Sequence, residues 1–241
     1  MNAVFAADLV FYLLLLPLVF YIIWTRRRGG LLAWYYLIIF CIARVVGGAM
    51  GVHDEKSLAA NIIVGVGISP LILAIDGLLH EARSYRIPGR QWLGWAVVAL
   101  VTALMATALA LAIVGALNIY EGHPKPDSLS HWKVGTGLMV LVWGWEVIWA
   151  GILLLPSQRR KDAFLYYAGT TLLQGSFLAL LFAGIRAIYQ LIAVCTQRKD
   201  LSSSTGSLAV RVVLVFLPEA FTVLSMVLVG VQTRNVSRAS M

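Results

Sequence analysis

Charged residues are scarce in this sequence. Asp, Glu, Lys and Arg make up 12% of its 241 residues, against about 25% in an average soluble domain. Hydrophobic residues make up 60%, and the mean hydropathy is +0.85. A water-soluble fold needs more polar side chains than this to cover its surface. The composition therefore excludes a soluble enzyme, a nucleic-acid-binding module and a disordered tail, and it indicates a polytopic membrane protein.

Several sequence signals are also missing. The two cysteines, Cys41 and Cys195, cannot build a disulfide framework. No Lys or Arg precedes Arg26, so the first apolar stretch lacks the basic region of a secretory signal and is expected to remain as a span. Asp-rich diphosphate motifs and the motifs of serine hydrolases, zinc proteases and nucleotide-binding proteins do not occur. We therefore expect no magnesium–diphosphate site.

Long apolar runs are what the sequence does contain. A helix needs about 20 apolar residues to cross the hydrocarbon core of a bilayer. Seven runs qualify, at 4–24, 31–50, 59–80, 91–117, 133–155, 164–190 and 207–232. No loop between them is long enough to fold alone. The sequence thus predicts an all-α, seven-helix transmembrane bundle that forms one domain over residues 1–241.

Lys and Arg concentrate on one side of the predicted bundle. The breaks after the first, third and fifth runs, with the C-terminal tail, hold Arg26, Arg27, Arg28, Arg83, Arg86, Arg90, Arg159, Arg160, Lys161, Arg234 and Arg238. The opposite side holds Lys56, Lys125, Lys133, Arg198 and Lys199. The positive-inside rule then places the N-terminus outside or in the lumen and the C-terminus in the cytosol. The endoplasmic reticulum membrane is the expected location.

Some polar side chains fall inside the predicted spans. Each is costly there unless it is paired or hydrated, which makes each a functional candidate. Those near mid-span or toward the outer ends predict a polar chamber that opens to the lumen: Arg44, Asn61, Glu146, Gln174, Arg186 and Glu219. Pro218 is expected to weaken the helix beside Glu219. The alternative is that Arg44 or Arg186 forms a buried ion pair with Glu219 that fixes helix packing.

Further polar residues lie near the ends of the predicted spans. Asp8, one turn into the first run, is expected to be a hydrated terminal residue. Asp76 and His80 lie one helical turn apart in the third run. They are either functional candidates or a pair that bond each other at the membrane interface.

Two tryptophans flank an acid in the fifth run. Trp143 and Trp149 lie three residues either side of Glu146, so all three can share one helix face. A carboxyl group held protonated in an apolar pocket can donate a proton, and indole faces can stabilise a cation formed beside it. The alternative is a Trp-rich helix contact with a hydrogen-bonded Glu146.

Three stretches together carry a resemblance. They are 43–48 (ARVVGG), Asn61 through Ser69-Pro70-Leu71, and 184–189 (GIRAIY) followed by Pro218-Glu219. Their order resembles a large fungal seven-helix membrane family. Some relatives of that family are similar to the membrane-bound terpene cyclases of fungal meroterpenoid pathways, the ascofuranone, ascochlorin and macrophorin type.

This resemblance implies a proton-initiated cyclase of the isomerase or lyase type. An acid would protonate a terminal epoxide or olefin of a lipophilic prenylated substrate, and a neighbouring double bond would attack, without a metal or redox cofactor. The implied proton donor is Glu219, with Glu146 as rival donor or terminating base. The implied substrate-binding residues are Arg44, Asn61, Gln174, Arg186 and Tyr189 around the polar groups, with Trp143 and Trp149 along the path of the cation.

A non-enzymatic heptahelical receptor or small-solute carrier is the competing class. Seven helices with an outside N-terminus also fit a receptor, but the short, basic cytosolic loops offer little surface for a coupling partner. A carrier more often shows related halves and broken helices, and neither is clear in the sequence.

Overall fold

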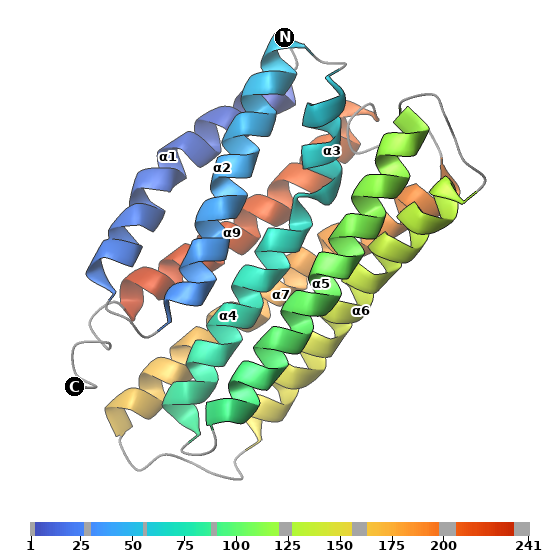
Figure 1. Cartoon of the computed structure of the whole chain (residues 1–241). Coiled ribbons are helices and arrows are strands. Elements are labelled where there is room, and N and C mark those ends of the chain that lie inside the picture. The colour runs from blue at the N-terminus through green and yellow to red at the C-terminus, as the bar shows by residue number, and fades with distance from the viewer. Residues whose placement is uncertain are drawn as a thin grey trace.

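The computed structural model describes residues 3–26, 30–54, 57–87, 91–120, 127–155, 163–197 and 206–233. Within these ranges the chain forms long helices that run up and down an elongated bundle (Figure 1). They are α1 (Ala3–Thr25), α2 (Leu31–His53), α3 (Leu58–Val66), α4 (Ile68–Arg86), α5 (Gln91–Tyr120), α6 (Ser128–Leu154), α7 (Ala163–Thr196), α8 (Leu208–Val210), the π-helical segment η2 (Arg211–Phe216) and α9 (Leu217–Gln232).

These helices make seven apolar segments long enough to cross a membrane. The third segment joins α3 to α4, and the seventh joins α8, η2 and α9. The predicted all-α, seven-helix membrane bundle is therefore confirmed, and the chain is a multi-pass membrane protein. Several helices extend beyond the predicted runs: α6 begins at Ser128 and α7 continues to Thr196. A helix satisfies its own backbone hydrogen bonds, so it can continue past the hydrocarbon into the polar interface.

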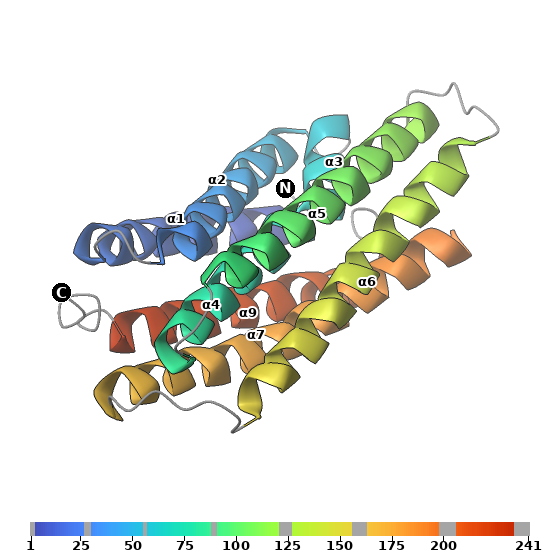
Figure 2. The ribbon, with the colours of Figure 1, turned by 60° about the horizontal axis from the view of Figure 1, so that its bottom comes forward.

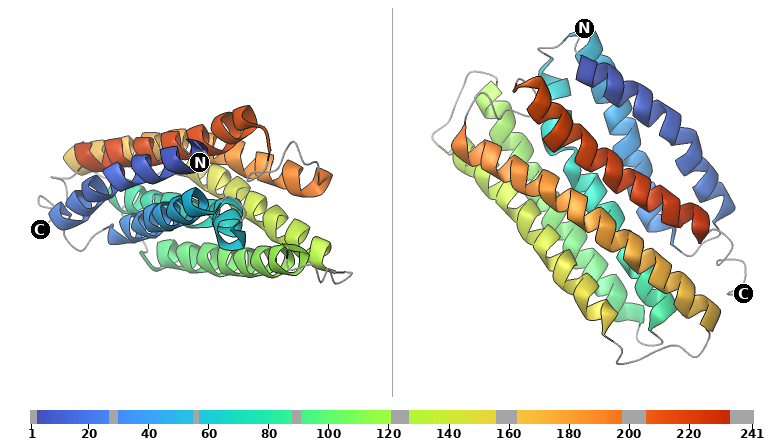
Figure 3. Two further views of the ribbon diagram at one scale, coloured as in Figure 1. Left: turned by 90° about the horizontal axis from the view of Figure 1, so that it is seen from above. Right: turned by 180° about the vertical axis from the view of Figure 1, so that it is seen from behind.

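The helices α4 and α7 form the centre of the bundle. α4 packs against α2, α5, α6, α7 and α9, and α7 packs against α4, α6 and α9. α1 lies at one edge, mainly against α2. Figures 2 and 3 show α7 and α9 lying side by side, with α5 and α6 paired at the opposite edge from α1. Polar groups on α4 and α7 are consequently enclosed by other helices.

The outer surface is apolar, as a bilayer requires. Large hydrophobic side chains such as Leu14 and Leu141 are about three-quarters exposed, and each would contact lipid. Several charged side chains are instead buried inside, namely Asp8, Arg44, Glu146, Arg186 and Glu219. This distribution places the candidate chemistry in the interior.

Two spans depart from regular α-helix. The third span changes from α3 to α4 at Gly67, where a Cβ atom would lie 2.7 Å from the Ile63 carbonyl oxygen and 3.2 Å from Nη2 of Arg44. The seventh span contains η2 directly before the Leu217-Pro218 start of α9. The expected weakening beside Pro218 is confirmed, since proline lacks the N–H that a regular helix would use. π-Helical turns of this kind frequently occur at functional sites.

Candidate functional site

Glu219 lies in the first turn of α9 and binds two arginines. Nε of Arg186, on α7, donates to Oε1 of Glu219 at 2.8 Å. Nη2 of Arg44, on α2, forms a salt bridge with Oε2 of the same carboxylate. All three side chains are essentially inaccessible. The alternative interpretation, a buried ion pair that joins helices, is therefore confirmed.

Arg186 also supports the break in the third span. Its Nη2 donates to the Val64 carbonyl oxygen at 2.9 Å, and its Nη1 donates to Oε1 of Gln190 at 2.8 Å. Val64 lies in the last turn of α3, where carbonyl groups lose their helical partners. Ser69 Oγ donates to the Val66 carbonyl in the same way, at 3.0 Å. Protein side chains thus satisfy carbonyl groups that the break leaves open.

Other predicted residues lie around this ion-pair cluster. The guanidinium of Arg186 lies 5.8 Å from the ring centre of Tyr189. Asn61 lies one turn before Val64 on α3, and its buried Oδ1 has no hydrogen-bond partner among the described residues. Tyr12, which sequence reasoning missed, is fully buried and within electrostatic range of Glu219 and Arg44.

The expectation for Asp8 was wrong. Its side chain is 7% exposed, and its Oδ2 lies 4.0 Å from Nη1 of Arg44. A buried carboxylate is stabilised by a nearby cation, so the arginine explains why Asp8 faces the bundle. Asp8 therefore belongs to the rim of the ion-pair cluster.

Gln174 does not join the other candidates. Its side chain is exposed on the outer face of α7, whereas the neighbouring Leu172 and Leu173 face the core. Because α7 is apolar around most of its circumference, span position alone could not indicate the face. The prediction that Gln174 contributes to an interior chamber is wrong.

Glu146 forms a second, separate site. It lies on α6, its side chain is 0% exposed, and neither carboxyl oxygen has a hydrogen-bond partner among the described residues. The described ionisable group that acts on it electrostatically is Asp76 on α4, itself 2% exposed. The expected single chamber is therefore two sites, because Glu146 faces α4 and another acid, away from the two arginines that bind Glu219.

The flanking tryptophans have different roles. Nε1 of Trp143 donates to the Leu180 carbonyl oxygen at 2.9 Å, and its ring packs against Gly184, which joins α6 to α7. Trp149 is half-buried against the core. The helix-contact interpretation is confirmed for Trp143. The same interpretation also assumed that Glu146 is hydrogen-bonded, but neither of its carboxyl oxygens has a hydrogen-bond partner among the described residues.

Asp76 and His80 do not bond each other. The described contacts include no hydrogen bond between them, and His80 instead packs against Trp95 with ring centres 4.7 Å apart. A Cβ atom on Gly94 would lie 2.9 Å from Nδ1 of His80. The alternative of a directly bonded pair is thus wrong, and the imidazole packs against α5.

Sequence reasoning missed a charged cluster at the opposite end of the bundle. Arg26 is buried, and its Nη1 donates to both carboxylate oxygens of Glu81, at 2.5 and 2.6 Å. Its Nη2 donates to Oγ1 of Thr233, and its guanidinium lies 4.8 Å from the ring centre of Trp34. Arg26 looked like a topology signal because it begins a basic loop. The intramembrane acid Glu81 was the signal that could have revealed the pair.

Arg86, expected in a loop, is also buried and lies in the last turn of α4. It donates to the Tyr166 hydroxyl at 3.2 Å and to Oγ1 of Thr170 at 3.3 Å. Arg83 and Lys133, also used to predict the orientation, lie within the described residues. The remaining charges used for that prediction lie outside the described residues, namely Arg27, Arg28, Lys56, Arg90, Lys125, Arg159, Arg160, Lys161, Arg198, Lys199, Arg234 and Arg238.

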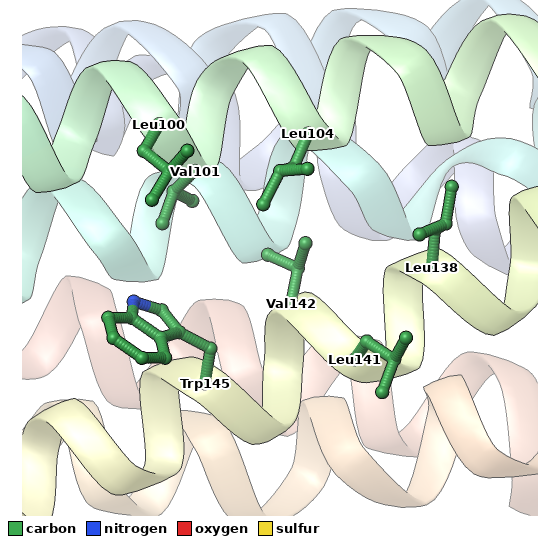
Figure 4. Close-up of a pocket in the computed structure, with 7 residues that line it drawn as sticks. All are labelled: Leu100, Val101, Leu104, Leu138, Leu141, Val142 and Trp145. Atoms are coloured by element: carbon green, nitrogen blue, oxygen red, sulfur yellow. The ribbon is translucent and has the colours of Figure 1, made fainter.

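An apolar groove lies between α5 and α6. Its volume is about 280 Å³, and Figure 4 shows its lining: Leu100, Val101, Leu104, Leu138, Leu141, Val142 and Trp145. Val142 lies one helical turn before Glu146 on the same face of α6. Glu146 is not among the lining residues, so the groove ends about one helical turn from the acid.

Comparison with known proteins assigns the chain to a family. Residues 1–236 match the model of a family described as Domain of unknown function (DUF7702). No curated protein and no solved structure matches the chain. The match spans nearly all of the sequence, so the chain belongs to the DUF7702 family.

Proposed function

We propose that this protein is a membrane-embedded terpene cyclase that uses Glu146 as its acid. The observation that carries the proposal is a fully buried carboxyl group with no described hydrogen-bond partner, one helical turn from the lining of an apolar groove. Charging a carboxyl group in a membrane is costly without a cation, so Glu146 is suited to hold a proton. The resemblance of 43–48, 61–71 and 184–189 to the fungal seven-helix family supports the same activity.

Glu146 is a better donor than Glu219 for a geometric reason. Both oxygens of Glu219 already face guanidinium groups, from Arg186 and Arg44. A donor must direct its proton toward substrate, and that direction is occupied at Glu219. We therefore assign the ion-pair cluster, including Arg44, to helix positioning. Asn61, whose buried Oδ1 has no described hydrogen-bond partner, is the residue that we assign to a polar head group.

The proposed reaction balances without a co-reactant. Glu146 gives its proton to the oxygen of a terminal epoxide, the carbon–oxygen bond breaks, and a neighbouring carbon–carbon double bond attacks the electron-poor carbon. The resulting cation loses a proton from an adjacent carbon, which leaves a new double bond. The carboxylate left on Glu146 accepts that proton, which restores the acid for the next turnover. Substrate and product are isomers, so no oxidant or reductant is consumed.

The groove between α5 and α6 suits a lipophilic chain. Its lining is apolar throughout, and it faces the bilayer in which a prenylated phenol or quinone would dissolve. Lateral entry from the membrane would bring the prenyl end to Val142 and then to Glu146. Excluding water along this path protects a carbocation from premature capture. An endoplasmic reticulum location is part of the same proposal.

The test uses the whole chain in yeast microsomes. The microsomes receive a farnesylated phenol or its terminal epoxide, and products are separated by chromatography and weighed by mass spectrometry. We expect a new isomer of unchanged mass, absent from microsomes without the protein and lost in Glu146→Gln. Asp54→Asn is the matched control, because Asp54 is an exposed acid just after α2 and should leave turnover intact.

A result without any isomer from either substrate, with folded protein in the membrane, would contradict the cyclase. An isomer that survives in Glu146→Gln would keep the enzyme and overturn the assignment of the acid. If that isomer disappeared in Glu219→Gln instead, the ion-pair cluster would be the catalytic site.

A proton-coupled carrier is the second candidate, favoured by one observation. The third span breaks between α3 and α4 at Gly67, and carriers often bind substrate at such interrupted helices. Here Arg186 and Ser69 fill carbonyl groups at the break. Reconstituted vesicles that lose a pH gradient only when a solute is added, and only with the wild-type chain, would favour the carrier.

A further inference from the structure

We propose that Glu146, Asp76 and His80 form a proton relay that links the middle of the bundle to its end at the junction of α4 and α5. The relay requires only proton exchange at Glu146. It therefore goes beyond the cyclase, and it would serve a carrier equally.

The first step of the relay joins two acids on facing helices. Ile72 of α4 and Val142 of α6 belong to one hydrophobic cluster, and Asp76 and Glu146 each follow these residues by one helical turn on the same face. Both acids are almost completely buried. Neither forms a salt bridge or hydrogen bond with the described residues. A carboxyl group without a cation is costly in a membrane, and chains of Asp, Glu and His are typical of proton paths.

The second step runs along α4. His80 follows Asp76 by four residues, so the two side chains lie on one face about one turn apart. They are not hydrogen-bonded to each other, so transfer between them requires a bridging water. Imidazole suits this position because it both accepts and donates a proton near neutral pH.

Exposure increases along the three residues. Glu146 is 0% exposed and Asp76 is 2% exposed, whereas His80 is only half-buried. His80 lies against Gly94 and Trp95 near the beginning of α5. Arg83 is the described charged group that acts on His80, and Asp76 is the one that acts on Glu146. The gradient gives the relay one closed end at Glu146 and one end that water can reach.

Hydrogen–deuterium exchange of a buried carboxyl group tests the relay without substrate. The whole chain is reconstituted in phosphatidylcholine vesicles, transferred into D₂O and followed by infrared spectroscopy. Glu146→Gln identifies the carboxylic-acid band of Glu146 by its loss. We expect Asp76→Asn and His80→Ala to slow the deuterium shift of that band by about a hundredfold, the scale of a positioned proton-transfer group.

Two controls separate the relay from general packing effects. His53→Asn changes an exposed histidine at the end of α2 and should leave the exchange rate unchanged. Added imidazole should restore fast exchange in His80→Ala, which a purely structural histidine would not allow. Unchanged exchange in both Asp76→Asn and His80→Ala, or the absence of any band lost in Glu146→Gln, would overturn the relay. Failure of the cyclase assay alone would not.

Discussion

At Glu219, each carboxylate oxygen faces a guanidinium group, from Arg186 on one side and Arg44 on the other. At Glu146, neither oxygen has a described hydrogen-bond partner. Both acids are fully buried, so exposure does not distinguish them. Their partners distinguish them: Glu219 joins α2, α7 and α9 through the two arginines, whereas Glu146 is left available for proton transfer.

Gly30 gives a test of the missed cluster around Arg26 at the residue scale. Its φ of +90° is unfavourable for residues with a Cβ atom, and that atom would collide with the Glu81 carboxylate. We expect Gly30→Ala to destabilise the protein by at least about 1–2 kcal/mol, seen as a lower thermal midpoint in detergent. Gly137→Ala is the control. No atom lies within 4 Å of its added methyl group, so helix propensity should raise its midpoint.

Individual charged residues were predictable as interior groups, but their partners were not. Because a charged side chain is costly in contact with lipid, Arg44, Arg186 and Glu219 were correctly predicted to lie inside the bundle. Gln174 was wrongly predicted to face the interior, because a span that is apolar on nearly all sides does not reveal which face packs inward. The burial of Arg26 required knowing that α4 places Glu81 beside it.

The groove between α5 and α6 is the feature to test at the scale of elements. Leu104 lines it from α5 (Figure 4). We expect Leu104→Trp to fill the groove and lower kcat/KM for the prenylated substrate about tenfold or more, with little change in stability. Leu181→Trp adds the same bulk to an exposed position of α7 and should leave kcat/KM unchanged. Equal losses in both variants would argue against entry through the groove.

The irregular elements were only partly predictable. The departure from regular α-helix before α9 was predictable from Pro218, because a proline has no backbone N–H to donate. The break at Gly67 falls in the stretch from Asn61 to Leu71 that carries the family resemblance, in which a turn was implied. Pro70 has no N–H to donate to the Val66 carbonyl oxygen, and Ser69 Oγ donates there instead. The contacts of this break with Arg44 and Arg186 were not predictable.

For the whole molecule, the two free cysteines provide a test of orientation. Cys195 is exposed near the end of α7, and Cys41 is buried in α2. The predicted topology places Cys195 at the lumenal end. In sealed microsomes, we expect a membrane-impermeant maleimide to label Cys195 only after the membrane is permeabilised. Cys195→Ser identifies the labelled site, and labelling of Cys195 in intact microsomes would reverse the orientation.

The architecture of the whole molecule was largely predictable. Each span needs about 20 apolar residues, and the sequence contains seven such runs that all became helices. Which helices form the centre was not predictable, because lipid-facing and core-facing residues are both apolar. That arrangement decides that Glu146 meets Asp76 and that Glu219 meets the arginines.

We infer one difference between the two buried acids: Glu219 is held in an ion-pair cluster, whereas Glu146 is free for chemistry. Unfolding of Glu219→Gln and Glu146→Gln, compared in one detergent, tests it without a substrate. We expect Glu219→Gln to lose about 3–5 kcal/mol, because two buried arginines lose their shared carboxylate. Glu146→Gln should unfold at or above the wild-type midpoint, because no described partner is lost. The opposite order, with Glu146→Gln destabilised and Glu219→Gln as stable as wild type, would contradict the account.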